Sequence, residues 1–161
     1  MEKFMSPYKK EMYMDLGLKE TEQISRTSQR EEWTKDPEIK KYIYFHETHP
    51  EQKDSNALTD FQRYYEVYDH EKLVGDIKIF YENETDILQK RGQLLMIIGE
   101  RNNGIGTSAL KMLLEKIKDS YNSVYCQIRR TNIASLKMLK NNGFQIEEIE
   151  GEELTLAKYL N

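Results

Sequence analysis

The stretch from residue 94 to residue 117, LLMIIGERNNGIGTSALKMLLEKI, is the part of the sequence that decides the fold. Its aliphatic run over residues 94–98 is typical of a short buried strand. Gly104 and Gly106 follow, and glycine lets the backbone turn tightly and approach a ligand closely. The segment 105–118 is predicted to be a helix, because its apolar residues form one stripe at helical spacing: Leu110, Leu113, Leu114 and Ile117. A strand, a glycine turn and a helix start in this order suit the binding of phosphate or pyrophosphate by backbone N–H groups.

Three phosphate-binding loops can be compared with this turn. A Walker P-loop needs a lysine after its last glycine, and Gly106 is followed by Thr107, so that loop is excluded. A dinucleotide-binding loop needs a third glycine, and its absence disfavours that class. The remaining pattern is Arg101-x-x-Gly104-x-Gly106.

This pattern resembles the Arg/Gln-x-x-Gly-x-Gly/Ala pyrophosphate loop of the GCN5-related N-acetyltransferase (GNAT) superfamily. A second block, residues 132–144, resembles the family's Asn-x-x-Ser segment that ends in Gly-Phe, with the same spacing of eleven from Asn132 to Gly143. Ser135 and the segment 32–38 (EWTKDPE) resemble the subgroup of ribosomal-protein N-terminal acetyltransferases, the RimJ/RimL type. The resemblance extends over roughly residues 10–160, and we expect residues 1–161 to form a single domain.

The rest of the chain predicts a mixed α+β fold of the α/β/α kind. A helix is expected to start at Asp36-Pro37-Glu38, where a capping Asp precedes Pro at the first helical position. The other predicted elements, in chain order, are a strand at 10–18, helices at 21–32 and up to about 44, strands at 61–68, 73–81 and 94–98, a helix at 105–118, a strand at 123–128, a helix at 132–141, and strands at 144–149 and 153–160. The resemblance implies a mostly antiparallel sheet that is splayed between its fourth and fifth strands, with helices on both faces.

The resemblance also implies that acetyl-CoA lies in the V-shaped gap between those two strands. The backbone of Met96, Ile97 and Ile98 would pair with the pantetheine arm. The N–H groups that would hold the pyrophosphate are those of Arg101, Asn102, Asn103, Gly104, Ile105, Gly106 and Thr107. Asn132 and Ser135 would contact the pantetheine or hold the splay open, and the alternative is that they cap a helix N-terminus.

The implied chemistry is direct transfer of acetyl to a primary amine. A neutral amine attacks the thioester, a backbone N–H near Ile98 stabilises the oxyanion, and CoA leaves as a thiolate. Many relatives place a Tyr seven residues after the helix Asn, and this position is Leu139, so another group or water must serve as the acid. Tyr125 and Cys126 lie nearby, although Cys126 is expected to be a small buried hydrophobe.

Three carboxylates are candidates for the base that takes the proton of the amine. Glu100 follows the predicted strand at 94–98 and is the first candidate. Glu66 and Asp76 lie on two other predicted strands, and both are expected to be solvated surface acids.

The acceptor side is predicted near Trp33, Tyr42 and Tyr44, because the resemblance places this region beside the acceptor pocket and Tyr combines apolar area with a polar tip. The acceptor class stays open between a protein N-terminus, a small amine and an antibiotic. Two other functions also stay open: a non-catalytic acyl-CoA-binding module, and an unrelated α+β interaction domain.

Composition excludes several function classes. With 24 Lys and Arg against 28 Asp and Glu, the net charge of −4 argues against nucleic acid as the main partner. Three His and one Cys give no metal-ligand spacing, so no metal is expected. No apolar run approaches the roughly 20 residues of a membrane span, and the N-terminus has no secretion signal, so no membrane partner and a cytoplasmic location are expected. A monomer or a homodimer is expected.

Overall fold

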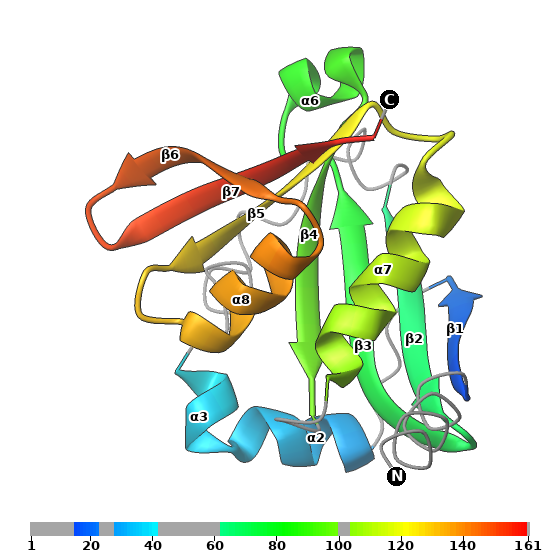
Figure 1. The fold of residues 1–161 in the computed structure, drawn as a ribbon. Coiled ribbons are helices and arrows are strands. Elements are labelled where there is room, and N and C mark those ends of the chain that lie inside the picture. Colours follow the sequence, from blue (N-terminus) through cyan, green and yellow to red (C-terminus); the bar gives the residue numbers. More distant parts are fainter. Residues whose placement is uncertain (1–14, 23–27, 42–61, 100–103, 161) are drawn as a thin grey trace, which may run out of the picture.

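The computed structural model describes residues 15–22, 28–41, 62–99 and 104–160. The strands in these ranges form one sheet, whose order is β1-β2-β3-β4-β5-β7-β6 (Figure 1). The strands are β1 (Leu16–Thr21), β2 (Arg63–Asp69), β3 (Lys72–Phe80), β4 (Arg91–Ile98), β5 (Ser123–Arg129), β6 (Gln145–Glu150) and β7 (Glu153–Tyr159).

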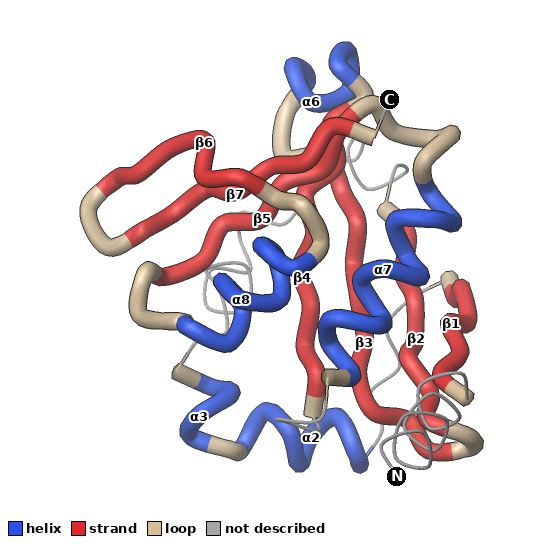
Figure 2. The backbone as a smooth tube through the Cα atoms, in the orientation of Figure 1, coloured by secondary structure: helices blue, strands red, loops and turns tan. Residues whose placement is uncertain are grey.

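The helices lie around this sheet in two groups, α7 with α8 and α2 with α3, while the short helix α6 stands apart. Figure 2 shows α7 in front of β2 and β3, and α8 in front of the region where β4 and β5 diverge, while α2 lies at the lower end of β4 and α3 lies below α8 in this view. The helices are α2 (Ser28–Lys35), α3 (Pro37–Lys40), α6 (Glu84–Gln89), α7 (Ile105–Ile117) and α8 (Ile133–Asn141). No helix in the described ranges is long and apolar enough to cross a bilayer.

The β4–β5 pair sets this sheet apart from a simple meander. It is the parallel pair, whereas the other neighbouring strands are antiparallel. Its register covers only Arg91–Gln93 against Ser123–Tyr125, and the two strands separate beyond these residues. The predicted mixed α+β fold, with a mostly antiparallel sheet splayed between the fourth and fifth strands, is confirmed.

The hydrophobic core lies between α7 and the sheet. The predicted apolar stripe is buried, with Leu110, Leu113 and Ile117 fully inaccessible to solvent. Ile77 and Ile79 of β3 are equally inaccessible and belong to the same cluster. Burying such side chains is the main stabilising contribution, at about 1.5–3 kcal/mol each.

The local signals at helix ends are also confirmed. Asp36 caps α3 through a hydrogen bond from the Glu38 N–H, with Pro at the first helical position. The helix α8 stops where Gly143 adopts a φ of +86°, a left-handed conformation that glycine reaches at little cost.

Several predicted boundaries differ from the structure. Thr21 ends β1 although a helix was expected to begin there, and α2 runs later, to Lys35. The short helix α6 was not predicted, because it has only Ile87 and Leu88 as large apolar residues and Leu88 is exposed. The predicted residues Tyr42 and Tyr44 lie outside the described residues.

Candidate active site

A cavity of about 630 Å³ opens where β4 and β5 separate. It begins at Leu94 and Cys126, the first residues after the paired part of each strand. Its size is typical of small-molecule and cofactor sites. The walls come from α3, β4, the start of α7, β5 and α8, and the lining residues used below are Glu38, Met96, Ile97, Ile98, Gly104, Gly106, Thr107, Cys126, Gln127, Asn132, Ser135, Met138 and Leu139.

The backbone of β4 presents polar groups to this cavity. The Gly99 N–H donates to the Val74 carbonyl on β3, and the Ser123 N–H of β5 lies 3.4 Å from the Lys90 carbonyl oxygen. Because backbone groups alternate along a strand, Met96 and Ile98 direct their N–H and C=O toward the β5 side, where the ladder has ended. Ile97 lines the cavity, but its backbone groups face β3 in the register with Asp76.

The first turn of α7 closes one end of the cavity. Gly104 has a φ of +77°, which favours glycine, and no side chain caps the helix there. The first intrahelical bond runs from the Ser108 N–H to the Gly104 carbonyl, so the N–H groups of Gly106 and Thr107 precede the first intrahelical donor. This end carries the positive pole of the helix dipole. The geometry of this turn suits the binding of an anion. The other predicted residues of the loop, Glu100, Arg101, Asn102 and Asn103, lie outside the described residues.

A glycine at position 106 keeps this turn close to α8. A Cβ atom there would lie 2.9 Å from Met138 Sδ and 3.6 Å from Ile98 Cγ1. The two predicted glycines therefore have different reasons: Gly104 adopts a left-handed conformation, and Gly106 allows α7 to approach Met138 of α8 closely.

The start of α8 forms the opposite wall. Asn132 caps this helix, with its Oδ1 accepting from the Ser135 N–H at 3.2 Å, and both residues line the cavity. The capping alternative is thus realised, and it leaves both residues beside the cavity. At the far end of α8, the Asn142 amide donates to the Thr107 carbonyl and to the Met138 carbonyl, which ties α8 to the first turn of α7. The sequence gives no sign of this clamp, because the bond to Thr107 joins residues 35 positions apart.

The side chains considered as the acid occupy different environments. Leu139, at the usual Tyr position, is 1% exposed and lines the cavity. Cys126 also lines it, and burial raises the pKa of its thiol to about 12, so the thiol stays protonated at neutral pH. Tyr125 donates to Asp86 instead of facing the cavity, and burial raises its pKa.

The carboxylates on β2 and β3 differ from their prediction. Glu66 and Asp76 were expected to be solvated, but they are 6% and 4% exposed, so that prediction is wrong. Asp76 forms an ion pair of 2.5 Å with Arg30 of α2, and Tyr68 donates to Glu66. The physical reason is that the middle residues of both β2 and β3 are covered on the two faces of the sheet. Neither residue lines the cavity.

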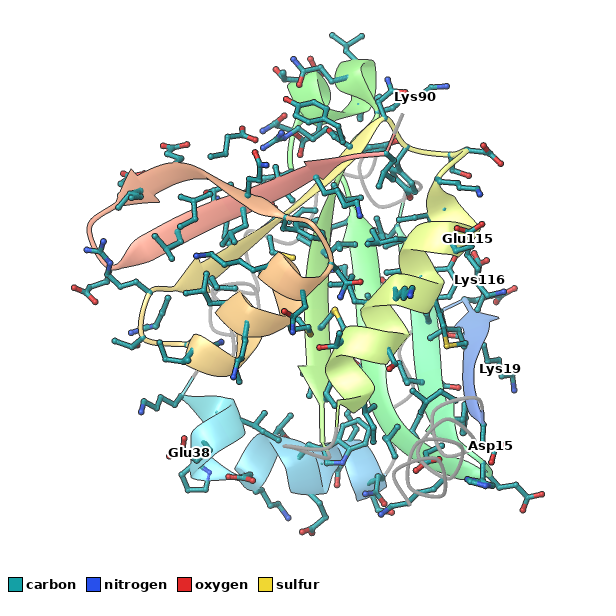
Figure 3. All side chains as sticks on the ribbon, viewed as in Figure 1. Asp15, Lys19, Glu38, Lys90, Glu115 and Lys116 are labelled. Atoms are coloured by element: carbon teal, nitrogen blue, oxygen red, sulfur yellow. The ribbon has the colours of Figure 1, made fainter. Side chains whose placement is uncertain are left out.

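The helix α3 contributes a carboxylate that was not predicted as a site residue. Glu38 lies at the cavity wall and is exposed (Figure 3). Among the described lining residues, it is the carboxylate-bearing one. Its sequence signal was interpreted only as an acid in the first turn of a helix.

Trp33 packs at the end of β4. It is 5% exposed, and a Cβ atom on Gly99 would lie 2.0 Å from Trp33 Nε1, so the indole ring rests on a glycine backbone. Trp33 is not among the lining residues of the cavity. Its predicted contact with the acceptor stays a prediction.

The separated ends of β4 and β5 and the glycine turn at the start of α7 agree with a family comparison. The model of the acetyltransferase (GNAT) domain family matches residues 22–145, and the chain belongs to that family. No curated protein sequence matches the chain.

Solved structures of N-acetyltransferases share the fold. PseH from Campylobacter jejuni matches with a TM-score of 0.60 and 17% identity over 90% of this chain and 98% of that chain. The spermidine N-acetyltransferase from Vibrio cholerae, solved with CoA and spermine, matches with a TM-score of 0.65 and 16% identity over 91% of this chain and 96% of that chain. At such identities the likeness concerns the fold.

The subgroup is a separate question. RimJ from Mycobacterium smegmatis matches with a TM-score of 0.52 and 18% identity over 62% of this chain and 53% of that chain. Because acetyltransferases of other kinds match over more of the chain, the RimJ/RimL subgroup stays a prediction.

Proposed function

We propose that this protein is an acetyl-CoA-dependent N-acetyltransferase that transfers acetyl to a primary amine by direct attack on the thioester. The observation that carries the proposal is the cavity between the separated ends of β4 and β5, with the start of α7 at one end of it. Family membership supports acetyl transfer, and the V. cholerae relative was solved with CoA and an amine.

The residues present fit acetyl-CoA in two respects. Met96 and Ile98 direct backbone N–H and C=O groups toward the cavity, where an amide-containing pantetheine arm can complete the strand's hydrogen bonding. The N–H groups of Gly106 and Thr107 lie at a helix N-terminus, where a pyrophosphate is stabilised by the helix dipole. Asn132 and Ser135 would bound the arm on the α8 side.

Acetyl-CoA supplies an activated acyl group, and the protein must handle the protons. The amine has to be neutral when it attacks, so a base or water takes its proton first. The Ile98 N–H is our candidate donor to the oxyanion, because it faces the cavity. Neither Leu139 nor Tyr125 can protonate a thiolate in the cavity, and the raised pKa of the Cys126 thiol makes it a weaker acid than an ordinary thiol, so we assign that step to water.

We infer that the acceptor is a cationic amine before it loses its proton. Glu38 provides an exposed carboxylate at the cavity wall, which attracts an ammonium group as it approaches. A small amine, a protein N-terminus and an amino-bearing antibiotic all carry this group, and the predicted RimJ/RimL subgroup favours the N-terminus.

A second function is favoured by one observation. Leu139 fills the position where many relatives carry a tyrosine, and it is buried against the cavity. An acyl-CoA-binding module without turnover would also accommodate this leucine.

The test measures CoA release with a thiol reagent while acetyl-CoA is held constant and a panel of amines is varied. The panel contains polyamines, aminoglycosides and short peptides with free N-termini. Amine-dependent CoA release supports the enzyme. Tight binding of acetyl-CoA without turnover supports the binding module. Failure of millimolar acetyl-CoA to raise the melting temperature contradicts both, because a ligand that binds the native state must stabilise it.

A further inference from the structure

The cavity passes through the sheet from one face to the other. Five consecutive residues of β4, 94–98, line it. Because side chains on a strand alternate between the two faces, consecutive residues can line one cavity only where it opens to both faces. Leu94 and Cys126 belong to the core cluster that contains the α7 residues. The next residue on each strand, Leu95 and Gln127, therefore lines the cavity from the face away from α7.

The helix α3 meets the cavity on this second face. Arg30 of α2 forms its ion pair with Asp76, which alternates on β3 with the core residue Ile77, so α2 lies on the face away from α7. The helix α3 follows α2 after a single residue, and Glu38 and Ile39 of α3 line the cavity. Since the anion site at α7 takes CoA in the proposed function, the face with α3 is left to the amine and is called the acceptor side below.

The acceptor side of the cavity is mainly apolar. Ile97 lies there, because it stands opposite Asp76 in the antiparallel register, and Ile39 and Leu95 line the same side. Ile133, the first residue of α8, also lines the cavity and is 63% exposed, which places it at the mouth. In ligand pockets apolar walls provide most of the contact area, and a few polar groups fix the orientation of the ligand. An acceptor that fits these walls therefore carries an apolar group.

The charge on the acceptor side matches a single ammonium group. Glu38 is the carboxylate-bearing residue among the described lining residues. The side-chain oxygen of Gln127 already accepts from the Gln93 amide at 3.2 Å, and Asp76 is paired with Arg30 and does not line the cavity. A second ammonium group would lose its water here without gaining a partner, which is costly. A monoamine therefore fits this side better than a polyamine or an aminoglycoside.

We propose that the acceptor is a monoamine with an apolar group close to its nitrogen, the chemistry of a peptide whose first residue has an apolar side chain. Glu38 attracts the ammonium group, and Ile39 and Ile133 contact the apolar group while the neutral amine reaches the thioester. The proposal rests on the proposed function and narrows its acceptor class. A free branched alkylamine has the same chemistry, and the experiment separates these two sources.

The experiment measures kcat/KM for matched acceptors at saturating acetyl-CoA. Three amidated tripeptides with Leu, Gly or Lys before a common Gly-Gly differ only in the first side chain, which is apolar, absent or cationic. We expect the Leu peptide to exceed the Gly peptide by about tenfold or more, as methylene groups do in an apolar pocket. The Lys peptide and spermidine should also be poorer acceptors than the Leu peptide. Isopentylamine represents the free-amine source.

The variant Ile133→Ser tests the apolar contact. Its matched control is Ile149→Ser, because Ile149 is a similarly exposed isoleucine on β6 that does not line the cavity. Ile133→Ser should lower kcat/KM for the Leu peptide about three- to tenfold and leave the Gly peptide within about twofold. A folding defect would lower both peptides alike, so their ratio reports the contact. The affinity for acetyl-CoA should not change, and Ile149→Ser should alter none of these quantities.

The variant Ile39→Glu tests the match of charges. It adds a second carboxylate to the acceptor side, and two carboxylates match two ammonium groups. The ratio of kcat/KM for the Lys peptide to that for the Leu peptide should therefore rise about two- to fivefold at low salt. An unchanged ratio would contradict the placement of Ile39 beside the acceptor.

The outcomes separate this proposal from the proposed function. If the wild-type chain turns over the Gly peptide or spermidine as well as the Leu peptide, the proposal is overturned and the function stands. If Ile133→Ser weakens acetyl-CoA binding and lowers both peptides equally, Ile133 belongs to the CoA side and the proposal is overturned. A Leu peptide better than isopentylamine supports a peptide N-terminus, and the reverse supports a free amine of the same chemistry. If no amine is turned over, the proposed function fails and the proposal with it.

Discussion

The line along which β4 and β5 face each other, called the seam below, has a paired half and an open half. Both halves are built from the same two strands, but only one of them is closed by hydrogen bonds between the strands. In the first half, Arg91–Gln93 pair with Ser123–Tyr125, and Gly92 lies under the ring of Tyr121. In the second half the ladder stops, and the cavity begins at Leu94 and Cys126. The first half holds the sheet together, whereas the second half is open to a ligand.

The difference shows where a sheet can carry chemistry. Backbone N–H and C=O groups need partners, and inside a closed sheet the neighbouring strand supplies them. Where the two strands part, Met96 and Ile98 keep one neighbour on β3 and direct their polar groups to the cavity on the other side. A ligand with amide groups can form the hydrogen bonds that these backbone groups would otherwise make with a neighbouring strand.

The largest effect is expected from filling the open half. Gly106→Leu should lower the affinity for acetyl-CoA about 100-fold or more, because the side chain enters the space near Ile98 and Met138. The free energy of unfolding should change by less than about 1 kcal/mol, since Leu gains helix propensity and the nearest atom is the flexible end of Met138. Isothermal titration and chemical denaturation measure the two quantities. A folded Gly106→Leu chain with wild-type affinity would contradict the assignment of this turn.

The paired half should respond in the opposite way. A Cβ atom on Gly92 would lie 2.9 Å from Ile79 Cγ2 and 3.0 Å from the Tyr121 ring. Gly92→Ala should therefore lower the free energy of unfolding by about 1–3 kcal/mol, as overpacking does. The affinity of the remaining folded protein for acetyl-CoA should be unchanged. Equal losses of affinity in Gly92→Ala and Gly106→Leu would remove the distinction between the two halves.

A smaller effect is expected at the wall of the open half. Glu38→Gln should raise KM for a cationic amine by about two- to fivefold at low salt and less at high salt, because an exposed charge acts through a screened field. The matched control is Glu115→Gln, an exposed acid on α7 that lies apart from Glu38 (Figure 3). Steady-state kinetics at two ionic strengths measure the effect. A salt-independent effect, or the same effect in Glu115→Gln, would argue against steering by Glu38.

The smallest effect concerns the turn between β2 and β3, away from the seam. Exposed His70 has Nε2 2.8 Å from Asp15 Oδ2 and Nδ1 3.0 Å from Asp69 Oδ1. The hydrogen bond with Asp69, and next the charge of Asp15, raise the pKa of His70 above its ordinary value. This stabilisation is complete below the unfolded-state pKa and is lost as the pH rises through the raised folded-state pKa.

Denaturation of the wild type and of His70→Gln over about pH 5–9 tests this pH dependence. The wild type should lose a small part of its unfolding free energy as the pH rises, and His70→Gln should lack this part. Acetyl-CoA affinity should show no dependence on His70. A His70-dependent affinity would mean that the turn communicates with the cleft.

The sequence predicts the elements whose signals are local. The apolar spacing of Leu110, Leu113 and Ile117 predicts α7, and Asp36-Pro37 predicts the start of α3. Gly104 and Gly106 place the turn before α7, because backbone conformation and close approach both leave a glycine in the sequence.

Features that depend on how distant strands pair and are covered could not be predicted from local sequence signals. Whether Asp76 is buried depends on the cover over the second face of β3, and its own alternating strand contains no sign of that cover. The meeting of Gln93 with Gln127 requires the parallel register of β4 and β5. Long-range pairing decides these contacts, so residue type and spacing leave them open.

The most direct test follows backbone amide signals by NMR while acetyl-CoA is added to isotope-labelled protein. We expect large, saturable shifts for the amides of Met96, Ile98 and Gly106, which face or flank the open half of the seam. The amides of Gly92 and Val124, in the paired half, should shift little. Shifts that cluster away from the open half, or none at millimolar acetyl-CoA, would contradict the claim that the parting of β4 and β5 forms the binding site.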